Sequence, residues 1–266
     1  MLRIFFIGDV VGRPGRRFVI ERLHALRVER GIDLVIANGE NAAGGSGITG
    51  AVARDLLGAG IDGITLGDHV WDQRGWTEEI GDFEQVCKPA NLPAATPGRA
   101  WIRCETRSGT AIAVFTVLGR QFMKGEIDSA FHTSERLLEE IRGAGIDHVL
   151  VEVHAEATSE KVALGRFLDG RVIGVLGTHT HIPTADLSVL PGGSAYQTDV
   201  GMSGPYDSVL GRDVESVVER FRDGLPRRFP VAEHDVRICG AILDYDPDAR
   251  TVVAAERLEE RRGDPA

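Results

Sequence analysis

Short apolar runs that alternate with helical patterns constrain the fold of this sequence more than any other feature. Runs rich in β-branched and aromatic residues occupy positions 2–7, 34–37, 64–66, 111–118, 148–153 and 172–176. Such runs predict buried strands, and their alternation with helices predicts an α/β fold with mainly parallel pairing. The end of the chain differs, because residues 238–245 and 251–256 flank a turn at 246–248 and predict an antiparallel hairpin. Residues 187–198 favour further antiparallel strands.

Helix signals separate these predicted strands. Pro14 lies near the start of a helix that ends at about Gly31, and Thr49 can cap a second helix. Further helices are predicted over residues 134–142 and from about Thr158 onward.

The chain length favours one large domain. A chain of 266 residues can bury about 70–75% of the surface that its unfolded form exposes, so it needs no disulfide or metal to fold. We expect a single domain over residues 1–258 and a charged C-terminal tail, residues 259–266, that frays.

Charge and cysteine content exclude several classes of protein. The net charge is −10, whereas extended binding to DNA or RNA needs clustered Lys and Arg. The three cysteines, Cys87, Cys104 and Cys239, are far apart, which indicates a reducing compartment. No apolar stretch approaches the roughly 20 residues of a membrane span. We therefore expect a cytoplasmic location, no membrane contact and no extended nucleic-acid partner.

Chemically active side chains directly follow five of the predicted strands. They are Asp9, Glu40, Asn41, Asp68, His69, His154, His179 and His181. Because the carboxyl ends of parallel strands meet at one edge of an α/β sheet, we expect these side chains to gather there. Imidazole and carboxylate groups together suit iron, manganese, zinc and similar first-row metal ions.

Each of these residues taken alone also has a structural explanation. Asp9 can cap the helix that follows it, and Asn41 can belong to a turn. Asp68 and His69 can be an ordinary loop pair. His154 follows five apolar residues and can be a hydrogen-bonded core histidine. Only the complete set makes a metal site the better explanation.

The sharpest local signal is the pair His179 and His181. Two histidines spaced i, i+2 after a buried strand, beside glycine and threonine, suit chelation better than burial. Two metal ions about 3.5–4 Å apart can clamp a phosphoryl group and supply a hydroxide nucleophile. Such a pair needs a shared carboxylate, for which Glu40 is the candidate.

The order of these residues resembles the pattern of the calcineurin-like metallophosphoesterases, which is DxH, GD, GNH, H and GHxH. Longer phrases resemble the YmdB-like bacterial branch of that family: GDVVGRPGR (8–16), ANGENAAGGSGIT (37–49), HAEATSEK (154–161), GTHTHIPTAD (177–186) and TDVGMSGPYDSV (198–209). That branch is associated with 2′,3′-cyclic nucleotide phosphodiesterase activity. The resemblance implies a four-layer α/β/β/α sandwich, a small phosphate-ester or cyclic nucleotide substrate, and a homo-oligomer.

The resemblance also implies ligands for two divalent or mixed-valence metal ions: Asp9, Glu40, Asn41, Asp68, His154, His179 and His181. By this resemblance, Asp9 and His181 should hold the first ion, and Glu40 should bridge the pair. Asp68 and the two remaining histidines should hold the second ion. A metal-bridging hydroxide would attack phosphorus, and His69 should donate a proton to the leaving oxygen.

Two positions depart from the general pattern of the family. Val11 stands where DxH has its histidine, so the carbonyl oxygen of Asn41 is expected to take that ligand position. Fewer nitrogen ligands leave a harder site, which favours iron or manganese over zinc. Asp68 stands where GNH has asparagine, so it can still bind metal but lacks an amide that could contact the phosphate.

Two features near the predicted site have two explanations each. Asp72 either holds His69 in place or caps a helix before Gln73. Gly44 and Gly45 either bind phosphate oxygens through their amides or form a flexible loop that close packing requires.

Three functions are compatible with such a centre. The leading hypothesis is a phosphodiesterase that acts on small cyclic nucleotides such as 2′,3′-cAMP. A phosphomonoesterase, either a nucleotidase or a phosphoprotein phosphatase, would carry the same metal ions and differ in its pocket wall. A non-catalytic metal-dependent nucleotide sensor or regulator would be favoured by the loss of a ligand, and the nearly complete ligand set therefore favours an enzyme.

Overall fold

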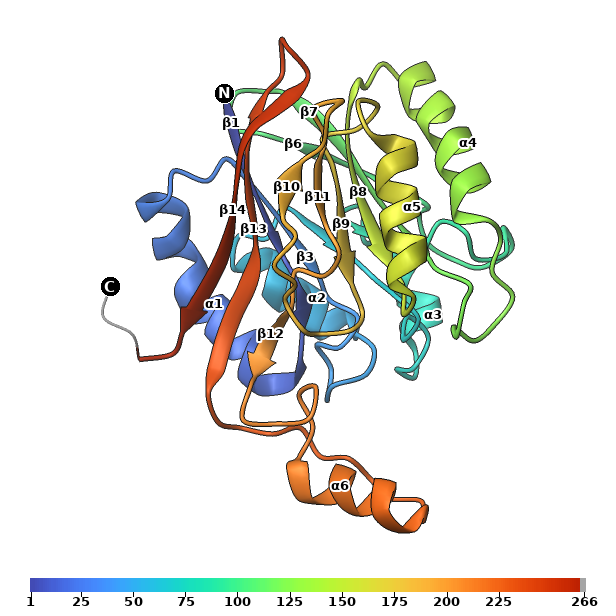
Figure 1. Cartoon of the computed structure of the whole chain (residues 1–266), viewed down its shortest axis with the longest axis vertical. Coiled ribbons are helices and arrows are strands. Elements are labelled where there is room, and N and C mark those ends of the chain that lie inside the picture. Colours follow the sequence, from blue (N-terminus) through green and yellow to red (C-terminus); the bar gives the residue numbers. More distant parts are fainter. Residues whose placement is uncertain (264–266) are drawn as a thin grey trace.

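Two β-sheets stack face to face and carry helices on both outer surfaces (Figure 1). The computed structural model describes residues 1–263. Three buried apolar clusters separate the layers: one under α1 and α2, one between the two sheets, and one under α4 and α5. This is the four-layer α/β/β/α sandwich expected from the sequence.

The first sheet has the strand order β2-β12-β13-β1-β3-β4-β5, and β14 pairs with β13. Its strands are β1 (Leu2–Ile7), β2 (Asp9–Val10), β3 (Leu34–Asn38), β4 (Gly63–Thr65), β5 (Val86–Cys87), β12 (Met202–Pro205), β13 (Val236–Asp246) and β14 (Thr251–Arg261). Strands β1, β3, β4 and β5 are parallel, whereas β13 runs antiparallel to both β1 and β14. The predicted hairpin is therefore present, and β13 joins it to the parallel strands.

The second sheet has the strand order β10-β11-β9-β8-β7-β6. Its strands are β6 (Ile102–Glu105), β7 (Ala111–Leu118), β8 (His148–His154), β9 (Gly174–Thr178), β10 (Ser188–Val189) and β11 (Ala195–Gln197). The four central strands are parallel, and β6 and β10 pair antiparallel at the two edges. The parallel strands of both sheets place their carboxyl ends where the predicted site residues lie.

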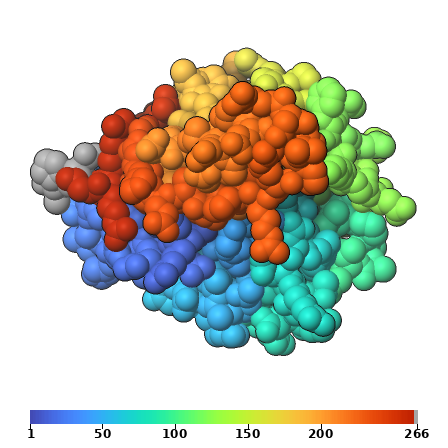
Figure 2. Space-filling model, turned by 90° about the horizontal axis from the view of Figure 1, so that it is seen from below, coloured from blue at the N-terminus to red at the C-terminus, as the bar shows by residue number. Residues whose placement is uncertain are grey.

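The helices cover the outer faces, with one exception. They are α1 (Gly12–Glu29), α2 (Gly50–Gly58), α3 (Trp76–Glu79), α4 (Ala130–Gly143), α5 (Thr158–Leu168) and α6 (Val214–Asp223), with a 3₁₀ turn at Ile80–Asp82. Helix α6 was not predicted, and it projects from the body of the molecule (Figure 1). Viewed from that end, the segment that contains it lies across the middle of the face (Figure 2).

The prediction that the C-terminal tail frays from residue 259 is wrong for residues 259–261. Strand β14 continues to Arg261, and Glu259 pairs with Cys239 in the register of β13. The charged side chains do not prevent pairing, because Glu259 accepts a hydrogen bond of 2.9 Å from Arg237. Residues 264–266 of the predicted tail lie outside the described residues, and the single domain over 1–258 stays a prediction.

Two smaller expectations also meet the structure. Strand β9 occupies Gly174–Thr178, two residues later than predicted, because its ladder to β8 runs from Gly174 to Thr178. The three cysteines are buried and unpaired within residues 1–263. In the same range, no helix combines the length and apolar character needed to cross a bilayer.

Deleting residues 259–266 should lower the free energy of unfolding by about 2 kcal/mol, because each lost ladder hydrogen bond contributes about 1 kcal/mol. Urea unfolding followed by circular dichroism measures this change. A chain that ends after Gly263 is the matched control, because it keeps all of β14. Equal stability of all three chains would contradict the assignment of residues 259–261 to β14.

Candidate metal centre

The predicted site residues meet at the carboxyl ends of strands from both sheets. Asp9 begins β2, one residue beyond the end of β1, and Glu40 and Asp68 follow β3 and β4 in the first sheet. His154 ends β8 and His179 follows β9 in the second sheet. The side chains gather at the carboxyl ends of parallel strands, as predicted, but two stacked sheets share them where one sheet edge was expected.

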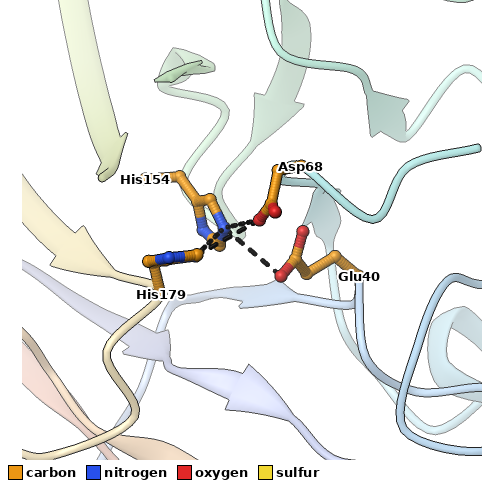
Figure 3. Close-up of side chains that lie close together, drawn as sticks. All are labelled: Glu40, Asp68, His154 and His179. Carbon is orange, nitrogen blue, oxygen red and sulfur yellow. Dashed lines mark hydrogen bonds and ion pairs between the residues drawn. The ribbon is translucent and has the colours of Figure 1, made fainter. Parts of the chain in front are cut away.

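Four of these side chains form a compact cluster (Figure 3). Glu40, Asp68, His154 and His179 each offer one ligand atom, and these atoms lie within 4.8 Å of one another. The Nε2 atom of His154 lies 2.9 Å from Asp68 Oδ1 and 3.3 Å from Glu40 Oε1. The Nδ1 atom of His179 lies 3.2 Å from the same Asp68 oxygen. Two carboxylates and two imidazoles at such distances are a ligand set for a first-row metal ion.

Asp9 and His181 lie beside this cluster. His181 Nε2 is 3.9 Å from Asp9 Oδ1, and the backbone N–H of His179 donates to Asp9 Oδ2 at 3.2 Å. Asp9 is fully buried, and its Oδ1 atom has no hydrogen-bond partner among residues 1–263. A buried carboxylate oxygen without a donor is costly unless a cation binds it. The donor set therefore fits a second ion on this side.

Burial and close charges shift the pKa values of Asp9, Asp68 and His181. Burial raises the pKa of Asp9 to about 8. Burial also opposes ionisation of Asp68, but hydrogen bonds from His154 and His179 hold its pKa well below the usual range. Burial lowers the pKa of His181, which favours the neutral imidazole that a metal ion binds. A cation beside Asp9 would have the opposite effect to burial: it would lower the pKa of Asp9 and favour the carboxylate.

Asn41 contacts the carboxylate that is the candidate bridge. Its Nδ2 atom donates to Glu40 Oε1 at 2.8 Å, and both residues are buried. The structure thus brings Asn41 to the centre through its amide nitrogen. Metal binding by its carbonyl oxygen stays a prediction.

The loop that carries the two histidines after β9 is held in an uncommon conformation. His179 and His181 have φ angles of 91° and 65°, a left-handed region that costs about 1–3 kcal/mol at non-glycine residues. The buried carboxylate of Asp199 accepts from the backbone N–H of Thr180 at 3.0 Å. The ammonium group of Lys161, also buried, donates to Asp199 at 3.1 Å and to the Thr178 carbonyl at 2.6 Å.

No individual role was predicted from the sequence for Lys161 or Asp199, although Asp199 begins a turn-rich stretch, residues 199–205, that was a candidate for shaping the substrate pocket. Each lies inside one of the quoted phrases, but neither follows a strand beside other candidate ligands. A buried lysine and a buried aspartate that meet at 3.1 Å can be recognised only once the fold pairs α5 with the loop after β11. Glu156 was missed in the same way, and its Oε2 atom lies 3.2 Å from His179 Nε2.

His69 lies at the rim of the centre and is held by its neighbours. Its Nδ1 atom is 2.8 Å from Asp72 Oδ2 and 3.2 Å from the hydroxyl of Ser46, which itself donates to Asp72. Its backbone N–H donates to Glu40 Oε2 at 3.0 Å. Burial lowers the pKa of His69, but the charges of Glu40 and Asp68 and the Asp72 hydrogen bond outweigh burial and raise it.

Three of the open structural explanations can now be judged. Asp72 holds His69 and caps no helix, because α3 begins at Trp76 with Gly75 at its N-cap. Asp9 does not cap α1, whose N-cap residue is Val11. The glycine loop is tied rather than free, because Arg212 donates to the carbonyl oxygens of Gly44 and Gly45. Phosphate binding by the amides of these glycines stays a prediction.

The geometry can be compared with known proteins. A family model described as YmdB-like protein matches residues 5–258. The 2′,3′-cyclic-nucleotide 2′-phosphodiesterase of Bacillus subtilis (strain 168) is 43% identical over 257 residues, which cover 97% of this chain and 96% of the relative. A crystal structure of a hypothetical protein from Thermus thermophilus has a TM-score of 0.90 at 44% identity, over 98% of this chain and 99% of that chain. A crystal structure described as a novel phosphatase from Mycoplasma pneumoniae has a TM-score of 0.91 at 31% identity, over 99% and 95% of the two chains.

Replacing Gly67 with alanine should weaken metal binding by about 10–100-fold, the range seen when groups around metal ligands are disturbed. A Cβ atom at Gly67 would lie 2.2 Å from Glu40 Oε2 and 2.4 Å from His154 Nε2, so both side chains must move. Titration of the metal-free protein with Mn²⁺, followed by calorimetry, measures the effect. Gly81→Ala is the control, because a Cβ atom there meets nothing within 4 Å. Unchanged affinity in Gly67→Ala would place the metal elsewhere.

Proposed function

The chain belongs to the YmdB-like family and is a phosphoric ester hydrolase, and we propose that it is a metal-dependent phosphodiesterase that opens small cyclic nucleotides such as 2′,3′-cAMP. The observation that carries the proposal is the cluster of Glu40, Asp68, His154 and His179 beside the unpartnered buried oxygen of Asp9. The name of the Bacillus subtilis relative supports the substrate.

The proposed centre holds two metal ions, for which iron or manganese is favoured. Asp9, Asn41 and His181 would hold one ion. Asp68 and the histidines of the cluster would hold the other. Glu40 would be shared, because its Oε1 atom already lies between Asn41 Nδ2 and His154 Nε2, at 2.8 and 3.3 Å. When bound, two such ions supply a hydroxide nucleophile near neutral pH and neutralise charge on the phosphoryl group.

His69 is proposed to donate the proton that the leaving oxygen needs. Asp72 and Ser46 occupy its Nδ1 side, and within residues 1–263 no hydrogen bond engages Nε2, whose proton would face a substrate. Its raised pKa keeps the imidazolium form populated near neutral pH, as a general acid requires. Its side chain is 40% exposed, so a substrate can reach it.

We propose a small substrate and a cytoplasmic location. The net charge of −10 disfavours an extended nucleic acid, whereas a small phosphate ester needs only the local cations. A phosphomonoesterase is the second candidate, because the Mycoplasma pneumoniae structure is described as a phosphatase. A sensor ranks third. The loss of a ligand would favour it, whereas the predicted ligand residues all lie at or beside the centre.

A homo-oligomer remains part of the proposal, and α6 offers a surface for it. Val214, Val218 and Phe221 project from this helix with 42%, 45% and 84% of their surfaces exposed, whereas Val217 is its one buried residue. Apolar side chains gathered on one helix mark a contact surface more often than isolated ones do.

Replacing His69 with asparagine should lower the turnover of 2′,3′-cAMP by about 10²–10⁴-fold, because proton donation to the leaving oxygen is lost. Turnover of bis-p-nitrophenyl phosphate should fall much less, since p-nitrophenolate leaves without a proton. The metal content, measured by mass spectrometry, should stay unchanged. Loss of metal in the variant would show instead that His69 is a ligand.

The substrate class can be tested with three esters on the metal-loaded enzyme. We expect 2′,3′-cAMP and bis-p-nitrophenyl phosphate to be cleaved faster than the monoester p-nitrophenyl phosphate, and all activity to vanish in Glu40→Ala. Faster cleavage of the monoester would favour the phosphomonoesterase. Stoichiometric metal without turnover of any ester would favour the sensor.

A further inference from the structure

We propose that Glu152 is a positioning residue for the metal centre. It aligns one candidate ligand from each sheet through two chains of hydrogen bonds, here called arms: one leads to His154 and the other to Glu40. The inference rests on the metal centre of the proposed function. Glu152 lies in β8 two residues before His154, on the face of the strand that looks toward the other sheet. Its side chain is fully buried, so its acid group must be explained by the groups it contacts.

The first arm runs through Thr178 at the end of β9. The Thr178 hydroxyl donates to Glu152 Oε1 at 2.5 Å and lies 2.9 Å from Nδ1 of His154. A hydroxyl carries only one proton, and that proton is already directed at Glu152. The Thr178 oxygen must therefore accept from His154, which places a proton on Nδ1 of the imidazole.

This arm determines which nitrogen of His154 can bind metal. With a proton on Nδ1, Nε2 is the nitrogen left for a metal ion: it faces Glu40 and Asp68, at 3.3 and 2.9 Å from their oxygens, and the proton that it donates to Asp68 would leave when a cation binds. A second hydrogen-bonded group that fixes the tautomer of a histidine ligand is a general feature of metal sites. In this chain the group is a threonine whose own direction is fixed by Glu152.

The second arm runs through Asn38 at the end of β3, in the opposite sheet. Asn38 Nδ2 donates to the same Oε1 atom of Glu152 at 2.6 Å, and its Oδ1 atom accepts the backbone N–H of Glu40 at 2.9 Å. Asn38 is fully buried. One oxygen of Glu152 thus ties the turn that carries the candidate bridging carboxylate to the strand that carries His154.

The other oxygen of Glu152 makes the inference testable. Oε2 has no hydrogen-bond partner among residues 1–263. Glutamine at this position can therefore keep an acceptor oxygen toward Asn38 and Thr178 and turn its amide to the Oε2 side. Leucine removes the acceptor altogether. Comparing the glutamine and leucine variants therefore distinguishes the effect of the acceptor oxygen from the effect of side-chain volume.

The experiment compares two pairs of variants in the full chain. Thr178→Val removes the hydroxyl at nearly constant shape, whereas Thr178→Ser keeps it. Glu152→Leu removes the acceptor, whereas Glu152→Gln keeps it. Mn²⁺ binding to each metal-free protein is measured by calorimetry. The ¹⁵N shifts of His154 are measured by NMR in the metal-free protein at a pH high enough for the imidazole to be neutral, because its acidic neighbours raise the pKa of His154.

We expect Thr178→Val and Glu152→Leu to bind Mn²⁺ about 10–100-fold more weakly and to lose the protonated Nδ1 state of His154. Thr178→Ser and Glu152→Gln should restore both. Unchanged Mn²⁺ affinity and an unchanged tautomer in Thr178→Val would overturn the inference. If Glu152→Leu does not fold, the threonine pair still decides the question.

Failure of the proposed function would look different. The unmodified protein would then bind no Mn²⁺, whereas the NMR comparison of Thr178→Val with Thr178→Ser would still report whether the relay sets the tautomer. If the Thr178 arm fixes the tautomer but no metal binds, Glu152 positions His154 and the metal centre is rejected. An absent relay with normal metal binding would reject only the role of Glu152.

Discussion

The close approach of buried carboxylates and imidazoles between the two sheets is the constraint on which the rest of the structure depends. Isolated charges buried at this depth cost several kcal/mol each, by the usual order of magnitude for proteins. In the absence of a cation, burial raises the pKa of Asp9 to about 8, so the acid is favoured over the carboxylate at neutral pH. A bound metal ion would reverse that preference, and occupancy of the proposed centre would then be linked to the stability of the fold.

The surrounding fold can be understood as support for this arrangement. Parallel strands in both sheets deliver the ligands to one region, and no side chain is tolerated at Gly67, where the ligands approach the backbone. The left-handed backbone at His179 and His181 alternates with Thr178 and Thr180, which hydrogen-bond to the buried pair of Lys161 and Asp199. Strain at a site of this kind persists only where neighbouring contacts hold it.

The candidate ligands could be located from the sequence because each lies at or shortly beyond the end of a strand, as His154 does at the end of β8. The residues that hold these candidate ligands in place could not be predicted, because their roles depend on contacts between distant segments. Glu152 looks like a polar interruption of an apolar strand until β3 brings Asn38 within 2.6 Å of it. Helix α6 escaped prediction because its apolar residues contact little of the body, and the tail was misjudged because pairing with β13 outweighs a charged composition.

The most direct test of the two-metal account is a crystal structure of the protein as purified, with anomalous diffraction recorded at the iron and manganese absorption edges. The account predicts two peaks about 3.5–4 Å apart, both bonded to Glu40, with Asp9 and His181 on one and Asp68, His154 and His179 on the other. One peak, or none in crystals of fully active protein, would contradict it.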